Sequence, residues 1–343
     1  MKKTLIAVAA LAATASFAQV TLTGNIDISY HQISGSATTD TTALSGVGAS
    51  VGSSTTAINI ASVEDLGGGM KATAFLGLDP RAMINSNGTS APNGALGRHE
   101  AYVGVMGGFG GIYLGPKNSA TLDTWGARSP LGTATGAGFA NIQTAAGGLV
   151  RADQSVQYVS PTFNGITAKI TNAPGNTDAV TGITYAGLTD IGVSYANGPL
   201  VVAVSSLKRD SVVANAGTAA AAGVPGVAAT SAAADSTYNS YALNYAMGAA
   251  KLFIGGGKST GALVSSQKAM GASYSAGTWT FIGQYGTLEL SGNGIDRKNT
   301  GLRIDNALSK RTVAYVAYEA YDTGAGTATT KTNTAAIGVR HSF

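Results

Sequence analysis

Short stretches in which apolar and polar residues alternate recur along this chain, and each one predicts a β-strand. Near the start, Leu22, Ile26 and Tyr30 share one face, while Thr21 and Asp27 share the other. A period of two residues gives a strand one apolar and one polar face. The same pattern recurs at residues 154–158, 166–171, 191–195, 240–245, 302–305 and 333–343. We therefore expect an all-β protein.

Short turns alternate along the chain with longer polar or glycine-rich connections. The turns are expected at residues 64–69, 107–111, 161–165, 196–199, 246–249, 275–278 and 307–311. The longer loops are expected at 32–54, 80–97, 117–150, 172–181, 208–237, 259–266, 289–299 and 322–333. Even strand numbers, short periplasmic turns and longer external loops are typical of outer-membrane barrels. The pattern predicts a transmembrane antiparallel β-barrel of about 16 strands, a size that leaves room for an aqueous channel.

Several tyrosines fall near the ends of the expected strands. They are Tyr30, Tyr113, Tyr158, Tyr195, Tyr245, Tyr315 and Tyr321. Outer-membrane barrels carry girdles of aromatic residues where the strands enter and leave the lipid. We expect these tyrosines to contribute to such girdles, although tyrosine is also a common residue in any strand.

The first eighteen residues have the features of a secretory signal peptide. Lys2 and Lys3 form a basic start, residues 5–15 are apolar, and small residues lead to a cleavage site after Ala18. The apolar stretch is too short to span a bilayer as a helix. We expect two segments, a signal peptide at 1–18 and a barrel at 19–343, and export through the periplasm to the outer membrane.

The composition differs from that of an ordinary soluble protein. Charged residues make up 11% of the chain, against about 25% in a typical soluble domain. Loss of Lys2 and Lys3 would lower the net charge of +4 by two, which is far from the strongly basic surface of a nucleic-acid binder. The chain has no cysteine, and no acidic cluster has the spacing of metal ligands. We expect neither a metal nor another cofactor, and no nucleic-acid partner.

Two other classes of protein must be compared with a channel. An outer-membrane hydrolase would need a histidine beside a serine and a carboxylate, and no local motif places His31, His99 or His341 in that setting. An adhesin would show a repeat of fixed period, and none is visible. We expect no enzymatic activity, and a hydrolase or an adhesin without an open channel remains the alternative.

Several short motifs, taken in order, resemble one protein family. They are VTLTG at 20–24, EDLGGGMKA at 64–72, EAYVGV at 100–105 with GGFG at 107–110, SVQY at 155–158 with SPTF at 160–163, LSKRT at 308–312 and GVRHSF at 338–343. The chain resembles the Gram-negative general porins, in particular their β-proteobacterial branch. The resemblance implies a homotrimer in contact with outer-membrane lipid and lipopolysaccharide, which lets small hydrophilic solutes and ions diffuse through a water-filled pore.

The resemblance also implies that the third external loop, residues 117–150, folds into the barrel and narrows it. Family members place basic residues on the wall opposite acidic groups of this loop. In this chain, Ala57 and His99 stand at two positions that are usually arginine, and Arg151 is kept. The series of basic wall residues is therefore weaker here.

The residues that we expect at the constriction combine this resemblance with the alternation of the strands. They are His99, Lys117, Asp123, Arg128, Arg151, Asp153 and Lys169, with Arg151, Asp153, Gln157 and Lys169 on the face that lines the pore. The four Lys and Arg residues outnumber the two Asp residues, which predicts a weak preference for anions. Arg151 is expected to contribute most, because we place it on a strand.

Overall fold

The computed structural model describes residues 19–35, 46–49, 56–80, 96–132, 147–177, 184–211, 234–261, 264–290, 295–325 and 328–343. The signal peptide expected at 1–18 lies outside these ranges. The described strands are β1 (Gln19–Gly35), β2 (Gly46–Ala49), β3 (Ala57–Gly67), β4 (Met70–Leu78), β5 (Leu96–Gly107), β6 (Gly110–Leu114), β7 (Val156–Val159), β8 (Ile166–Ala173), β9 (Asn176–Thr177), β10 (Thr184–Tyr185), β11 (Leu188–Asn197), β12 (Leu200–Arg209), β13 (Ser236–Met247), β14 (Ala250–Gly261), β15 (Ser265–Ala276), β16 (Trp279–Leu290), β17 (Ile295–Ala307), β18 (Thr312–Ala325) and β19 (Ala328–Ser342), and the labelled helix is α3 (Ala120–Arg128).

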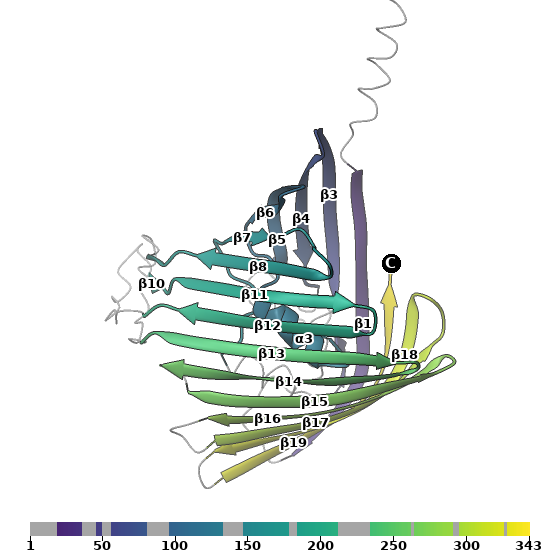
Figure 1. Cartoon of the computed structure of the whole chain (residues 1–343). Helices are drawn as coiled ribbons and strands as arrows, with labels where there is room; N and C mark the ends of the chain where they lie inside the picture. The colour runs from purple at the N-terminus through teal and green to yellow at the C-terminus, as the bar shows by residue number, and fades with distance from the viewer. Residues whose placement is uncertain are drawn as a thin grey trace, which may run out of the picture.

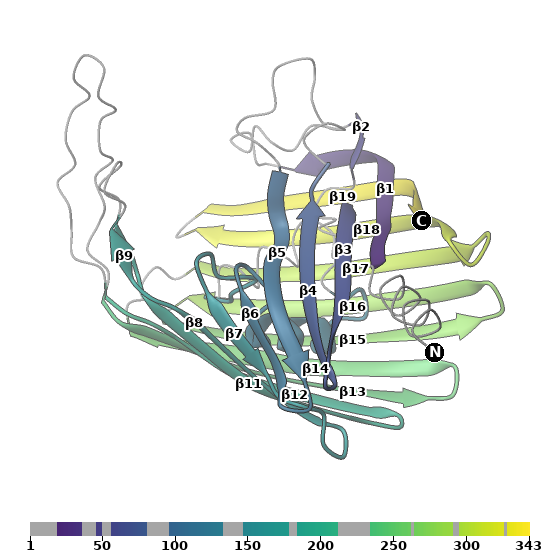
Figure 2. The ribbon, with the colours of Figure 1, turned by 90° about the horizontal axis from the view of Figure 1, so that it is seen from above.

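The strands form a closed barrel in which each neighbour runs antiparallel to the next (Figure 1). Closure occurs at β1, which pairs with β19 through residues 25–35 and with β3 through residues 19–25 (Figure 2). Strand β1 has β19 on one edge. On its other edge it pairs with β3 through residues 19–25 and with β2 through residues 28–31, so β2 and β3 occupy one position in the ring. The ring therefore has sixteen positions, and the expected transmembrane β-barrel is confirmed.

All seven expected turns lie between consecutive strands, at one end of the barrel that we call the turn end. The opposite end is the loop end. Three of the loops are shorter than expected, because β14 continues to Gly261, β16 to Leu290 and β18 to Ala325. The polar residues at these strand ends resemble a loop in sequence. At these residues the outward side chains stop being apolar, but the hydrogen bonds between the strands continue, so the strands are longer than the pattern of apolar residues predicted.

The two faces of the barrel wall are opposite in character to those of a soluble protein. Large apolar side chains such as Leu22, Ile254 and Met270 are exposed on what we call the outward face. Polar side chains such as Asp190 and Gln267 are buried on the inward face. Soluble proteins bury apolar residues and expose polar ones, whereas a barrel in lipid presents an apolar band outward and a polar interior.

The aromatic girdle agrees only partly with the expectation from sequence. Tyr158, Tyr195 and Tyr245 lie on the outward face close to the turn end. Tyr113 and Tyr315 point inward: Tyr113 lies beside Lys117, and the Tyr315 hydroxyl donates to Asp27 Oδ1. Tyr321 also lies inward, against the buried cluster Leu207, Tyr238 and Leu288. Proximity to a strand end does not reveal on which face a residue lies, which explains these three errors.

Phe343 extends the pairing of β19 with β1 by one further pair of backbone hydrogen bonds. Phe343 N donates to Gly24 O at 2.9 Å, and Gly24 N donates to Phe343 O at 3.0 Å. A Cβ atom on Gly24 would lie 2.6 Å from Phe343 Cζ, which is closer than van der Waals contact permits. Glycine at this position therefore leaves room for the Phe343 ring beside β1.

Replacing Gly24 with valine should lower the thermal unfolding midpoint of the folded barrel in detergent. The new side chain would clash with Ala57 O of β3 as well as with the Phe343 ring, and would strain the pairing of β1 on both sides, at a cost of about 1–3 kcal/mol. The Gly283→Val variant is the matched control, because its Cβ would meet only Leu302 Cδ2 at 3.6 Å. Equal midpoints for the two variants would contradict this account of closure.

Candidate functional site

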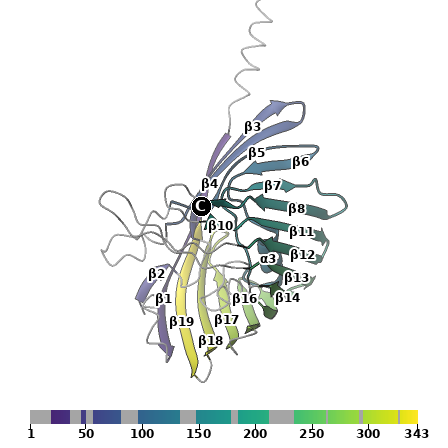
Figure 3. The same cartoon turned by 90° about the vertical axis from the view of Figure 1, so that its left-hand side faces the viewer.

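Helix α3 lies inside the barrel, on the concave side of the wall (Figure 3). The helix begins after Ser119, whose Oγ accepts a hydrogen bond from Leu122 N at 3.0 Å. A serine at this position satisfies one of the free N–H groups of the first turn. The same hydroxyl donates to Leu149 O at 2.7 Å, and Ser119 N donates to Val150 O at 3.0 Å. Ser119 thus joins the outgoing and returning parts of the loop expected at 117–150.

Asp190 of β11 holds the first turn of α3 against the wall. Its carboxylate accepts hydrogen bonds from Thr121 N at 3.0 Å and from Thr121 Oγ1 at 2.7 Å. Asp190 is completely buried. A helix N-terminus favours a negative charge, because its free N–H groups carry partial positive charge. The contact therefore compensates the burial of the carboxylate.

A chain of hydroxyl groups continues the contact along the helix. Ser205 Oγ donates to Thr121 Oγ1 at 3.3 Å and lies 2.7 Å from Ser240 Oγ. Ser240 Oγ in turn lies 2.6 Å from Thr124 Oγ1. Ser205 and Ser240 belong to the adjacent strands β12 and β13, so the helix is bound to three consecutive strands of the wall.

Arg128 and its neighbour hold the last turn of α3. Arg128 is 1% exposed, and its Nη1 donates to Gly256 O at 2.8 Å while Nη2 donates to Gln267 Oε1 at 3.1 Å. Asn244 Nδ2 donates to Ala127 O at 3.0 Å, which satisfies a carbonyl at the end of the helix. Arg128 therefore binds the wall. This placement differs from the expectation that it is a charge lining the constriction.

Two glycines of the wall provide the space that α3 occupies. A Cβ on Gly192 would lie 2.5 Å from Ala120 Cβ, and a Cβ on Gly255 would lie 2.8 Å from Arg128 Cβ. A glycine within a strand often marks a close approach of another segment. These inward-facing glycines are the sequence signal that could have located the docking of the loop.

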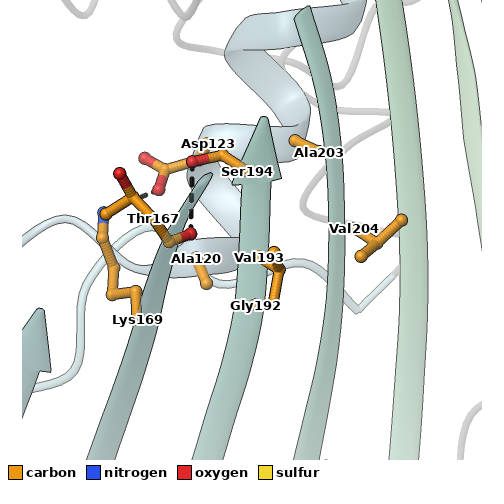
Figure 4. Close-up of a pocket in the computed structure, with 9 residues that line it drawn as sticks. All are labelled: Ala120, Asp123, Thr167, Lys169, Gly192, Val193, Ser194, Ala203 and Val204. Atoms are coloured by element: carbon orange, nitrogen blue, oxygen red, sulfur yellow. Dashed lines mark hydrogen bonds and ion pairs between the residues drawn. The ribbon is translucent and has the colours of Figure 1, made fainter. Parts of the chain in front are cut away.

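A small cavity remains between α3 and the wall. It has a volume of about 20 Å³ and is lined by Ala120, Asp123, Lys169 and Gly192, among others (Figure 4). This volume is enough for about one water molecule. The cavity is polar at one edge, where Asp123 Oδ2 lies 2.7 Å from Lys169 Nζ.

Asn118 gathers the polar residues at the start of the loop. Its Oδ1 accepts from Arg151 Nη1 at 2.9 Å, and its backbone O accepts from Gln157 Nε2 at 3.0 Å and from Lys169 Nζ at 3.2 Å. The ion pair of Lys169 with Asp123 adds an acid to the group. Burial raises the pKa of the Asp123 carboxyl above its ordinary value, and Lys169 opposes that rise.

Lys117 lies beside this group, between aromatic rings. Its ammonium lies 4.0 Å from the centre of the Tyr102 ring and 4.8 Å from that of Tyr113. Lys117 Nζ is also 3.5 Å from Glu100 Oε1, and Glu100 Oε1 accepts from Asn118 N at 2.9 Å. Rings and carboxylate together hold the ammonium group in one position.

The structure brings four of the expected residues together and separates the other three. Lys117, Asp123, Arg151 and Lys169 surround the start of the loop, and Asn118 and Glu100 complete a group that we call the loop-root cluster. Arg128 is buried in the wall, His99 Nε2 lies 4.0 Å from Asp79 Oδ2, and Asp153 is exposed in a turn.

One detail of the expectation for Arg151 is wrong. Strand β7 begins at Val156, and Arg151 precedes it, joined to Asn118 by an isolated β-bridge. The expected inward position of Gln157 agrees with its complete burial and its contact with Asn118. The alternation was extended too far towards the N-terminal side, across the exposed turn that contains Asp153.

Charged residues that the sequence analysis missed lie on the opposite wall. Arg303 Nε is 2.5 Å from Asp305 Oδ1, and the guanidinium carbon lies 3.9 Å from the centre of the Tyr315 ring. The Tyr315 hydroxyl reaches Asp27 of β1. These residues sit on β17, β18 and β1, across the ring from the strands that contact α3. Arg303 alternates with the outward residues Leu302 and Ile304 along β17, and this alternation could have identified it as a residue that faces the interior.

The histidines fall on three different strands. His31 is buried on β1. His99 lies on β5, close to Asp79, and His341 lies on β19, where its Nδ1 is 2.9 Å from Thr312 Oγ1. Among the described residues, no group of three or more His, Asp or Glu side chains is arranged to hold a metal ion. In the same part of the chain, no helix is both long enough and apolar enough to cross a membrane.

The amino-acid sequence matches the model of one protein family over most of its length. Residues 5–326 match the family model described as Gram-negative porin. The chain belongs to the Gram-negative porin family. Membership in this family and the barrel fold place the protein in the outer membrane, as expected from the sequence.

Individual relatives share about 30% or less of their sequence with this chain. The chain is 30% identical over 223 residues to outer membrane porin protein 32 of Delftia acidovorans, covering 62% of this chain and 61% of the relative. It is 28% identical over 152 residues to an outer membrane porin protein of Bordetella pertussis, covering 41% of this chain and 39% of that relative. The chain thus aligns with less than two thirds of the length of either relative.

Solved structures share the fold over nearly the whole chain. The anion-selective porin from Comamonas acidovorans superposes with a TM-score of 0.75 at 23% identity, covering 95% of this chain and 100% of that one. A loop-deletion mutant of the Vibrio cholerae outer membrane protein OmpT superposes with a TM-score of 0.66 at 15% identity, with 95% and 99% coverage. At these identities the likeness concerns the fold alone.

Removing the carboxylate of Asp190 should loosen α3. In the Asp190→Ala variant, Thr121 N loses its buried acceptor, which costs about 1–3 kcal/mol. We expect a lower thermal unfolding midpoint and more frequent brief current interruptions in planar-bilayer recordings. The Asp210→Ala variant removes an exposed acid that pairs with Lys208 and serves as the control. A steady current and an unchanged midpoint in Asp190→Ala would show that this contact does not hold the helix.

Proposed function

We propose that this protein is an outer-membrane porin, which forms a water-filled channel for passive diffusion of small hydrophilic solutes and ions. The observation that carries the proposal is the polar inward face of a closed barrel, with helix α3 bound to one side of it. A helix attached to the wall narrows the lumen on that side. The protein acts in this proposal as a passage, and no covalent chemistry is assigned to it.

The proposal includes export and assembly. The signal peptide at 1–18 is removed after Ala18, and the mature barrel begins at Gln19 and forms a homotrimer in the outer membrane. The sequence features of residues 1–18 support the cleavage, and the family resemblance supports the trimer. Native mass spectrometry of protein extracted in a mild detergent should give three times the mass of the 19–343 chain. A mass of one chain under all mild conditions would contradict the assembly.

We further propose that the channel weakly prefers anions. At the loop-root cluster, the three cations Lys117, Arg151 and Lys169 outnumber the two acids Asp123 and Glu100. Charges that line a narrow passage act strongly on passing ions, because little bulk water separates them. The structural relative from Comamonas acidovorans is an anion-selective porin, which points in the same direction. His99 and Asp153 are the outlying members of the proposed site, and Arg128 positions the loop.

Charge reversal at Arg151 tests this preference. The Arg151→Glu variant should move the reversal potential in a salt gradient towards cations at low salt, and the shift should shrink as added salt screens the charge. The Lys310→Glu variant makes the same charge reversal at an exposed position of the turn end, away from the loop-root cluster, so its reversal potential should change less. Clear cation selectivity of the natural protein, or equal shifts for the two variants, would contradict the proposed role of Arg151.

Acidification should strengthen the preference for anions. Because burial raises the pKa of Asp123, this carboxyl becomes neutral at a higher pH than an ordinary aspartate as the pH falls. Protonation removes a negative charge from the loop-root cluster, so the reversal potential should move towards anions on the acidic side of neutrality. The Asp123→Asn variant should already show that shift near neutral pH and should respond less to acid. An identical pH response in both proteins would rule out Asp123 as the group responsible.

A further inference from the structure

A cavity that plays no part in the proposed ion preference lies at the turn end of the wall. It has a volume of about 360 Å³ and is lined by Lys71, Met106, Tyr113 and Val159, together with glycines of the adjacent turns. A volume of this size is within the range of sites that bind small molecules. The lining strands β4, β5, β6 and β7 lie side by side (Figure 2). The cavity is therefore a hollow in one continuous surface.

The strand register places the lining residues in one row on the inward face. Lys71 pairs with Met106, Met106 pairs with Gly111, and Gly111 pairs with Val159. Residues that pair across strands share a face of the sheet. Tyr113 follows Gly111 by two positions on β6 and points inward, so the whole row faces the lumen. The short turns of an outer-membrane barrel face the periplasm, which puts this row at the periplasmic mouth of the channel.

Glycines create the hollow and leave an aromatic ring at its edge. A Cβ on Gly111 would lie 2.5 Å from Tyr113 Oη. The phenol ring of Tyr113 therefore lies along β6 above Gly111, with its hydroxyl directed towards the turn end. Gly107 and Gly110 add only backbone to the lining. Met106 and Tyr113 are both partly exposed, so a thioether and an aromatic ring form the apolar part of the cavity.

Lys71 supplies an exposed positive charge beside this apolar surface. No ion pair or hydrogen bond joins Lys71 to another residue in the described part of the chain. Its cross-strand neighbour is Asp65, whose Oδ1 accepts a hydrogen bond from Gly67 N at 2.8 Å. The lysines of the loop-root cluster differ in this respect, because Lys117 and Lys169 each lie against a carboxylate. Lys71 is therefore the cation of this wall whose ammonium group is open to a passing anion.

A strip of aromatic rings connects the cavity with the loop-root cluster. Phe75 is stacked on Tyr102 with ring centres 5.5 Å apart, and Tyr102 meets Tyr113 edge to face at 5.3 Å. Lys117 Nζ lies over both tyrosine rings. Tyr113 thus contacts the loop-root cluster at one side and lines the cavity at the other. A solute with an aromatic ring can exchange one ring contact for the next along this strip.

We propose that this cavity binds aromatic monocarboxylates at the periplasmic mouth, which rests on the proposed channel function and names a class of solute for it. The carboxylate pairs with Lys71, and the ring of the solute packs against Met106 and Tyr113. Contacts of sulfur with aromatic rings and between aromatic rings are both favourable. Lys71 is the single charged residue among the described lining residues, which matches one carboxylate. Binding is weak, because a solute that passes through a channel must also leave its site.

Calorimetric titration of the folded protein in detergent tests the site with three probes. Benzoate carries the ring and the charge, acetate carries only the charge, and benzamide carries only the ring; a titration into protein-free detergent is subtracted. Benzoate should bind with a dissociation constant of about 1 mM, and acetate about tenfold more weakly. The Lys71→Gln variant should bind benzoate about fivefold more weakly, as expected for an exposed ion pair, with benzamide unchanged. The Met106→Gln variant should weaken benzoate and benzamide and leave acetate unchanged.

The matched control is Lys251→Gln, which removes an exposed lysine near the turn end of β14. Lys251 alternates with the outward residue Leu252, so it also faces the lumen, and its Nζ lies 5.9 Å from the centre of the Phe253 ring. This variant should bind benzoate as the natural protein does. Equal losses in Lys71→Gln and Lys251→Gln would show a general effect of charge at the mouth and overturn the site.

Two further results would also overturn the site. One is equal affinity for acetate and benzoate, because the cavity would then recognise charge alone. The other is the absence of saturable benzoate binding up to about 10 mM, tenfold above the expected dissociation constant. A protein that gives either result but conducts potassium chloride across a planar bilayer lacks this site and keeps its channel function. Absence of that conductance would instead contradict the proposed channel, so the two failures are distinguishable.

Discussion

The hydrogen bonds between Asp190 and the first turn of α3 fix the interior of this barrel. A carboxylate with no exposure to water is stable there because the free N–H groups of the helix face it. Once Thr121 is held, the hydroxyls of β12 and β13 continue the contact, and Arg128 completes it at the other end. The loop-root cluster is joined to this docking, because Asp123 of α3 pairs with Lys169, whose ammonium group also donates to Asn118 O.

Glycine has a specific role in this arrangement. Gly192, Gly255 and Gly271 face inward, under Ala120, Arg128 and Pro130 respectively. Each glycine lacks a side chain at a point where a segment of the loop comes close to a strand, which leaves room for that segment. The adjacent Gly256 points outward and lies beneath Tyr241. A run of glycines that would weaken an ordinary strand thus serves both faces of β14.

Charges on the two faces of the wall meet different surroundings. Inside, Lys169 pairs with Asp123, and Arg303 pairs with Asp305. Such pairing compensates the loss of water around each group. Outside, Lys258 and Lys268 stand side by side above an apolar surface. Lysines on the outward face of a barrel cost little near the membrane surface, which agrees with the place of these two towards the loop end.

The sequence by itself determined the barrel, its sixteen strand positions, its seven turns and its membership among the porins. These features are local, because a wall between lipid and water demands alternation along every strand, and a short turn needs only a few residues. The placement of the loop was decided by the tertiary structure. Thr121 and its acceptor Asp190 are 69 positions apart, and Arg128 and Gln267 are 139 apart. Contacts of that range leave no periodic trace in the chain, so Arg128 could be recognised as charged, but its burial in the wall became visible only when the strands were assembled.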